Sequence, residues 1–317
     1  MQAHKVAFWV AHILALECCV LHAQPPDLSA SRTLVFERDV NTLSHWNRFP
    51  KFSGQLLIWC ENNFTSGPLI EIVDKNSVHD ELLFSLPDGA KITISDMAAA
   101  VDGEIAIVGT AWTMDRPSRA FLVRISPDRQ HQTITKLWPY HPEVVTFAPH
   151  GVIWTAGWVS DDDNLRVVTK HVARRYGSDG KMISETVIHV PDWRTGHVTY
   201  LVASQDRVGW FNDGSYIEFA LDGKEIAGYD GPEGDTLHDL SGVALSDQND
   251  VVVGRFSRKK AEFDLLDREN GTWIPASMEK ERLPSWARVL GFDRATLVVT
   301  SKTMGVLSRF NVQIDNK

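Results

Sequence analysis

The sequence is poor in cysteine. Only three of its 317 residues are cysteines, and two of these, Cys18 and Cys19, lie close to the N-terminus. A chain that loses this segment keeps Cys60 alone, so it forms no internal disulfide and no closed cysteine-based zinc site. Cys60 ends an apolar run, and we therefore expect a buried, unreactive thiol rather than a nucleophile.

Three catalytic signatures are also missing. The chain contains no Gly-x-Ser-x-Gly elbow, no His-Glu-x-x-His pair and no glycine-rich phosphate loop. These motifs would nominate a serine nucleophile, a catalytic zinc ion or a bound nucleotide. We accordingly predict no cofactor and no metal, and the sequence nominates no catalytic residue.

Excess positive charge is absent as well. The formal net charge is -9 and the pI is about 5.7, so long-range electrostatics repel nucleic acid and anionic membranes. One basic cluster, formed by Arg255 and residues 258–260, is too small to reverse this and is interpreted as a solvated loop. No apolar run is long and uninterrupted enough to predict a membrane-spanning helix.

The N-terminal segment differs from the rest of the chain. His4 and Lys5 precede a short apolar stretch, which His12 and Glu17 interrupt, and Ala23 precedes Gln24 and two prolines. This order is typical of a secretory signal peptide, which we predict over residues 1–23, with export to the periplasm or the cell exterior. An alternative is a lipid anchor at Cys18, although the preceding residue is not small.

Short apolar runs recur along the chain with a mean spacing of 48 residues. Each is rich in Val, Ile, Leu or Trp, and small or polar residues follow it. Such short β-branched runs indicate strands, and we find no convincing helical periodicity of ten residues or more. The equivalent positions, 43 to 55 residues apart, are Leu57, Ile105, Ile153, Val208, Val251 and Leu297.

Hairpin signals accompany these runs. The clearest are two Asp-Gly-Lys turns, at residues 179–181 and 222–224, each flanked by alternating apolar residues. Asp-Gly at such a place is a strong hairpin signal, and we expect positive φ at both turn positions. Four short strands in each unit of about 48 residues predict one blade of a β-propeller.

Six blades account for nearly the whole of residues 24–317, which we predict to form a single all-β domain. The predicted blades cover residues 45–87, 91–139, 141–190, 196–231, 237–276 and 284–315. Residues 33–37 remain as a lone strand, and we expect it to close the ring by joining the last blade, because this pairing covers two sheet edges. A β-sandwich or a two-domain β protein stays open as an alternative.

These repeats resemble the six-bladed β-propeller class. The resemblance rests on Asp102-Gly103 through Gly109, on Gly151 through Trp158, and on the two Asp-Gly-Lys hairpins. It implies the fold but no named functional subfamily, since propellers include hydrolases, lactonases, lyases and pure binding platforms.

Tryptophans are the best candidates for ligand contacts. Trp59, Trp154 and Trp210 lie within the apolar runs, and we expect them to pack between blades. Trp112 and Trp158 follow Gly109 and Gly157 at what we interpret as matching positions, and Trp193 lies in a link between blades. Trp112, Trp158 and Trp193 are therefore the predicted binding residues, since exposed aromatic rings stack on sugars or peptides.

Two other groups are interpreted as structural. The acidic run at residues 161–163 lacks the glycine and terminal glutamate of a calcium loop, and we expect a solvated hairpin tip. Histidines gather around the third blade, and we expect each to be buried and satisfied or exposed to solvent rather than a metal ligand. They are His141, His150, His189, His197 and, at the start of the fifth blade, His238.

Three hypotheses of function follow. The first is an exported, monomeric binding or scaffold propeller with a protein, peptide or carbohydrate ligand. The second is a propeller enzyme, either a metal-dependent lactonase-like hydrolase or a polysaccharide lyase. The third is a lipoprotein anchored at Cys18.

Overall fold

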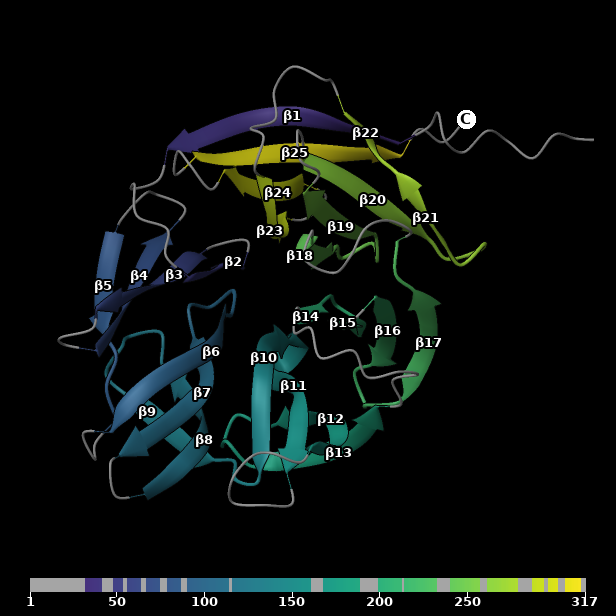
Figure 1. Ribbon diagram of the computed structural model, residues 1–317. Coiled ribbons are helices and arrows are strands. Elements are labelled where there is room, and N and C mark those ends of the chain that lie inside the picture. The colour runs from purple at the N-terminus through teal and green to yellow at the C-terminus, as the bar shows by residue number, and fades with distance from the viewer. Residues whose placement is uncertain are drawn as a thin grey trace, which may run out of the picture.

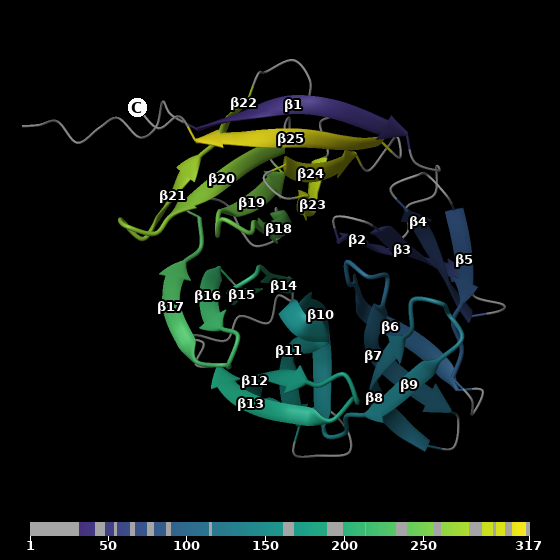
Figure 2. The ribbon, with the colours of Figure 1, turned by 180° about the vertical axis from the view of Figure 1, so that it is seen from behind.

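The computed structural model forms a ring of six sheets, all built from antiparallel strand pairs except for one short parallel pair in the sixth (Figures 1 and 2). Prediction and structure agree on an all-β propeller. None of the described segments forms a helix with the length and hydropathy that a membrane span requires. The structure describes residues 32–41, 48–53, 56–63, 67–74, 79–86, 90–113, 116–160, 168–188, 199–212, 214–232, 240–256, 261–278, 287–293, 296–301 and 306–314.

Each of the first five sheets is a four-stranded meander whose strands follow one another in chain order. The first consists of β2 (Arg48–Phe52), β3 (Leu56–Asn63), β4 (Gly67–Asp74) and β5 (His79–Leu83). The second consists of β6 (Lys91–Ala99), β7 (Ile105–Thr113), β8 (Arg116–Ile125) and β9 (Gln132–Lys136). The third consists of β10 (Tyr140–Ala148), β11 (Val152–Ser160), β12 (Val168–Tyr176) and β13 (Met182–Ile188).

The next two sheets repeat this arrangement. The fourth consists of β14 (Thr199–Ala203), β15 (Arg207–Asn212), β16 (Ser215–Ala220) and β17 (Glu225–Asp230). The fifth consists of β18 (Leu240–Leu245), β19 (Val251–Phe256), β20 (Ala261–Asp267) and β21 (Thr272–Pro275). The six apolar runs found in the sequence are the second strands of their sheets, which confirms the predicted repeat.

The N-terminal strand closes the ring. β1 (Arg32–Asn41) pairs antiparallel with β25 (Val306–Ile314), which follows β23 (Ala287–Asp293) and β24 (Thr296–Ser301). A two-residue strand, β22 (Ser277–Met278), pairs parallel with the far edge of β1, so the sixth sheet has five strands. The predicted closure by the leftover N-terminal strand is confirmed.

The hydrophobic core is divided among the contacts between neighbouring sheets. Six clusters of buried side chains each join residues of two adjacent sheets. One of them packs Leu57 and Trp59 of the first sheet against Leu290 and Val298 of the sixth. Because the first and last sheets share a cluster, the ring is closed by packing as well as by strand pairing.

The residues predicted to fill the core are where the sequence placed them. Trp154 and Trp210 are both 1% exposed and lie between the third and fourth sheets, while Trp59 is equally well buried. Cys60 is fully buried between the first and second sheets.

The Asp-Gly hairpins form, but with a different turn from the one predicted. Gly180 and Gly223 have φ angles of +76° and +98°, whereas Asp179 and Asp222 are not in the left-handed region. In the first hairpin the Gly180 N–H donates to the Gly177 carbonyl and the Gly177 N–H donates to the Lys181 carbonyl. This is a three-residue turn with a bulge, in which only the glycine needs positive φ.

The meander gives the ring two distinct ends. Turns between the first and second strands, and between the third and fourth, lie at one end, which we call the turn face. Connections between the second and third strands, and between successive sheets, lie at the other end, which we call the loop face.

Candidate functional site

The first strands of all six sheets surround a central cavity of about 1440 Å³. Its walls are mostly small or apolar side chains, such as Ala98, Val145, Leu201 and Val243. Charged side chains are few along the walls and gather towards the turn face, where Asp102, Glu104, Arg124, His150 and Asp247 contribute to the lining. The cavity therefore combines apolar walls with a charged end.

Register shifts interrupt five of the six channel-lining strands, namely β2, β6, β10, β18 and β23. In β6 and β10 the extra residues are Ser95 and Glu143, and both line the cavity. Bulges redirect side chains and are common beside functional sites. In the sequence, the bulges of β6 and β10 are signalled only by the glycines opposite them, Gly109 and Gly157.

An ion pair lies in the channel wall next to the β6 bulge. The Lys51 ammonium donates to Asp96 Oδ2 at 3.0 Å, and the Val145 N–H donates to the same oxygen at 3.0 Å. Asp96 is 3% exposed, and burial raises its pKa, against the lowering effects of Lys51 and the backbone N–H groups. This carboxylate therefore ties together the first strands of three consecutive sheets.

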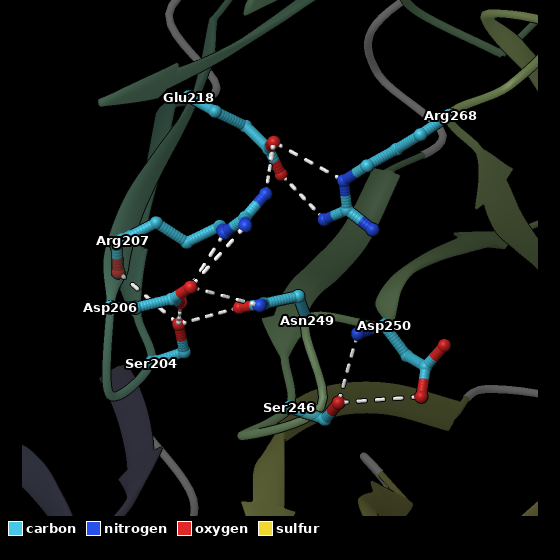
Figure 3. Close-up of polar contacts among 8 residues, drawn as sticks. All are labelled: Ser204, Asp206, Arg207, Glu218, Ser246, Asn249, Asp250 and Arg268. Carbon is cyan, nitrogen blue, oxygen red and sulfur yellow. Dashed lines mark hydrogen bonds and ion pairs between the residues drawn. The ribbon is translucent and has the colours of Figure 1, made fainter. Parts of the chain in front are cut away.

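Buried ion pairs also join sheets near the turn face. Glu218 of β16 is completely buried and accepts from Arg207 Nη1 at 3.0 Å and from Arg268 Nη2 at 2.6 Å (Figure 3). Arg268 belongs to the fifth sheet and the other two residues to the fourth. Beside them, Ser204 and Asp206 meet Asn249 across the same boundary, at 2.9 and 3.2 Å. These groups satisfy one another, so we assign them to the rigidity of the turn face.

Exposed aromatic side chains occur at the loop face instead. Among the tryptophans whose side chains the structure describes, only Trp112 and Trp138 are exposed, at 40% and 37%. Trp112 lies near the end of β7, and Trp138 lies in the link from β9 to β10. The Lys91 ammonium lies 4.9 Å from the centroid of the Trp112 ring, a cation–π contact that holds the indole.

Trp138 belongs to an aromatic cluster that extends into the third sheet. Its ring meets the His141 ring edge to face, with centroids 5.4 Å apart, and His141 stacks on Trp158 at 4.4 Å. His141 is 4% exposed, and burial lowers its pKa to about 4, so the imidazole is neutral at physiological pH. Its Nε2 atom is buried and has no hydrogen-bond partner among the residues that the structure describes.

The three predicted binding residues differ in their exposure and in whether the structure describes them. Trp112 is exposed at the loop face, and Trp158 is half-buried against His141 at the same face. Their positions do not match, because Trp112 lies three residues after Gly109 and Trp158 only one after Gly157, although both glycines lie opposite a bulge. Trp193 lies outside the described residues.

Most of the predicted structural groups lie outside the described part of the chain. The acidic run at residues 161–163 lies outside the described ranges, as do His189, His197 and His238. His150 is exposed, as expected, in a turn with φ of +63°. His141 is buried, but its Nε2 has no partner among the described residues, so the expected satisfied side chain is not found. Within the described ranges no three His, Cys, Asp or Glu side chains lie close enough together to hold a metal ion.

Sequence reasoning missed three residues of the loop face. Trp138 was not singled out because it follows an outer strand rather than an apolar repeat run. Lys91 is exposed directly opposite Trp112 on a neighbouring strand, whereas Arg119 is exposed opposite Ala111 and so on the other face of the sheet. Only the strand register reveals these positions.

Comparison with known proteins gives the fold. No family model matches the sequence, and no curated protein matches it. A protein of unknown function from Bacteroides caccae has a similar structure, with a TM-score of 0.50 and 14% identity, over 77% of this chain and 82% of that one.

Two other solved structures are similar over more of the chain. Virginiamycin B lyase from Staphylococcus aureus has 12% identity and a TM-score of 0.49, over 87% of this chain and 99% of that one. A gluconolactonase from Xanthomonas campestris has 13% identity and a TM-score of 0.49, over 88% and 97%. At these identities the likeness concerns the ring of sheets alone.

Proposed function

We propose that this protein is an exported, monomeric binding propeller that takes a carbohydrate or peptide ligand at its loop face. One observation carries the proposal, the exposure of Trp112 and Trp138 at the same end of the ring. Large aromatic side chains lose much contact with water when a ligand stacks on them. In a chain whose other described tryptophans are buried or half-buried, two exposed indoles mark this face for contact with a ligand.

The surroundings of the two indoles support the same assignment. Lys91 lies against Trp112, and His141 lies between Trp138 and Trp158, so neighbouring side chains hold the rings in place. Binding to a preorganised ring costs less conformational entropy than ordering a mobile one. Trp158 supports Trp138 through the His141 ring that contacts both. Trp193, in the link that follows β13, remains a predicted contact.

The proposal is tested by screening the mature protein against a glycan array and a peptide library. For a ligand found there, Trp112→Ala and Trp138→Ala are each expected to weaken binding by about 5- to 30-fold, the loss of roughly 1–2 kcal/mol of stacking and burial. Ile226→Ala removes an apolar side chain that is 50% exposed on the outer strand β17 and serves as the control. Equal losses in all three variants would show non-specific adhesion and contradict the proposal.

Export and oligomeric state need separate measurements. Intact mass of the protein recovered from its native host should show a mature chain that begins at Gln24, and light scattering should give the mass of one such chain. A chain that begins at a lipid-modified Cys18 would favour the anchored alternative, and an unprocessed chain would contradict export.

A further inference from the structure

Each of the first five sheets ends in an outer strand that pairs with only one other described strand, and these outer strands form the perimeter of the ring (Figures 1 and 2). Such an edge strand offers unpaired backbone N–H and C=O groups, so proteins usually protect it with charges, prolines or a short length. Four of the five outer strands have such protection. They are β5 with Asp80 and Glu81, β9 with Lys136 at its end, β17 with Glu225 and Asp230, and β21, four residues long, with Pro275 at its end.

The remaining outer strand, β13, is the longest of the five, with seven residues, and contains no lysine, arginine, aspartate or proline. Its one charged residue is Glu185. Lys170 and Arg174 of the neighbouring strand β12 pair with this carboxylate at 2.6 and 2.7 Å, so its charge is countered within the sheet. The exposed apolar side chains of β13 are Met182, Ile183 and Val187, at 53%, 52% and 43%.

The strand register shows which face of the sheet these side chains occupy. Met182 and Val187 are opposite Tyr176 and Val172 of β12, both of which are buried against the second sheet. Met182 and Val187 therefore lie on the same face. The pairing is regular beyond the shift at Ile183, so the following side chains alternate between the two faces.

The ring itself contains a fifth strand at one outer edge. In the sixth sheet, β22 pairs parallel with β1, with Ser277 and Met278 opposite Thr33 and Leu34. Among the described residues no strand takes this place beside β13. Every second residue of β13 turns its N–H and C=O away from β12, and an extended chain is the partner that matches the spacing of these groups.

We propose that the outer edge of β13 binds an extended, uncharged peptide, which joins the third sheet as its fifth strand. Backbone hydrogen bonds supply the affinity, and apolar side chains of the peptide beside Val187 and Met182 supply the preference for sequence. A charged side chain there would lose water beside apolar groups without gaining a counter-charge. This surface includes neither Trp112 nor Trp138, so the inference goes beyond the proposed function.

The test uses a fluorescently labelled heptapeptide of alternating threonine and valine, which is as long as β13. A second peptide has the same sequence and carries N-methyl groups on its three central residues, so that neither of its edges can pair with a strand. Anisotropy titration of the mature protein should show binding of the first peptide, and binding of the second should be weaker by about tenfold or more. Absence of binding of the first peptide, or equal binding of both, would overturn the inference.

Two protein variants compare β13 with another outer strand. Val187→Lys places a charge at the edge of β13 and should weaken binding of the first peptide by about tenfold. Ile226→Lys places the same charge on β17, at a side chain that is 50% exposed, and should change the affinity by less than about twofold. Both substitutions are at exposed positions, and circular dichroism checks that the fold is kept. Equal weakening in the two variants would contradict the assignment to β13.

Hydrogen exchange locates the bound peptide. With saturating peptide, amide exchange should slow in residues 182–188 and stay unchanged in residues 225–230 of β17. Exchange that slows in β17 instead, or in neither strand, would overturn the inference. Exchange in residues 182–188 that slows with protein concentration alone would show a second copy of the chain at this edge and would overturn the choice of partner.

The loop face is tested separately. If Trp112→Ala abolishes binding of the heptapeptide and Val187→Lys does not, the peptide binds at the exposed indoles. The inference about β13 then fails while the proposed function stands. If the heptapeptide binds β13 and no ligand is found for the loop face, the proposed function fails while the inference stands.

Discussion

His141 stacks on Trp158 with ring centroids 4.4 Å apart and an angle of 19° between the rings, in a pair of residues that are directly opposite on β10 and β11. The contact buries an imidazole whose Nε2 has no hydrogen-bond partner in the described part of the chain, and burial favours its neutral form. The pKa of this group falls from 6.5 to about 4.

A histidine with a lowered pKa makes stability depend on pH. Between pH 6.5 and 4 the His141 side chain is protonated in the unfolded chain but neutral in the folded chain. The contribution of this group to the free energy of unfolding is therefore fully present above pH 6.5 and is lost as the pH falls through about 4. We expect His141 to account for a loss of up to about 3 kcal/mol in the free energy of unfolding over this range. Urea unfolding at pH 7, 5.5 and 4.5 measures it.

Variants isolate this contribution from that of the carboxylates. His141→Phe keeps an aromatic ring beside Trp158 and should flatten the pH dependence, whereas His131→Gln removes a histidine that is 82% exposed and should not. If His141→Phe keeps the slope of the wild-type protein, the buried neutral imidazole is not the cause.

Glycine at position 157 is required by the bulge of β10. A Cβ atom there would collide with the His141 carbonyl oxygen and lie 2.8 Å from the Pro142 Cα, and both are backbone atoms that cannot move aside cheaply. We expect Gly157→Ala to lower the free energy of unfolding by about 2–3 kcal/mol. Gly228→Ala, where nothing lies within 4 Å, should change it by less than about 1 kcal/mol, and similar values for the two variants would contradict the steric account.

The Glu218 carboxylate holds two guanidinium groups from adjacent sheets. Glu218→Gln keeps the shape of the side chain but leaves Arg268 without this counter-charge and Arg207 with Asp206 alone. We expect a loss of about 2–3 kcal/mol in the free energy of unfolding, because both arginines keep some contact with water. Glu185→Gln is the control, since Glu185 pairs with Lys170 and Arg174 within one sheet and is partly exposed. Glu185→Gln should lower the free energy of unfolding by less than about 1 kcal/mol. A larger loss for Glu185→Gln than for Glu218→Gln would contradict the prediction.

Ring closure depends on β1. A chain that begins at residue 42 lacks the partner of β25 from Arg32 to Asn41 and exposes that edge. We expect this chain to unfold at a lower temperature and to associate through the open edge, as size-exclusion chromatography with light scattering would show, while a chain that begins at residue 24 stays monomeric. A synthetic peptide of residues 32–41 should restore the monomer, and a monomeric, equally stable truncated chain would contradict the closure.

The sequence by itself determined the repeat, the number of blades and the way in which the ring closes. Runs such as those around Ile105 and Val251 could be recognised because a strand buried on both faces must be continuously apolar. The leftover strand at residues 33–37 indicated the closure, because an unpaired sheet edge needs a partner. The Asp-Gly turns were located correctly, although only their glycines adopt positive φ.

The loop face was decided by tertiary structure. Trp112 and Trp158 looked alike beside Gly109 and Gly157, but side chains alternate along a strand and the bulges shift the register, so exposure could not be read from spacing. Lys91 and Trp138 are 47 positions apart in the chain and carry no pattern in common. They lie at the same end of the second sheet because hydrogen bonding from β6 to β9 aligns those strands, and that alignment is a property of the folded sheet.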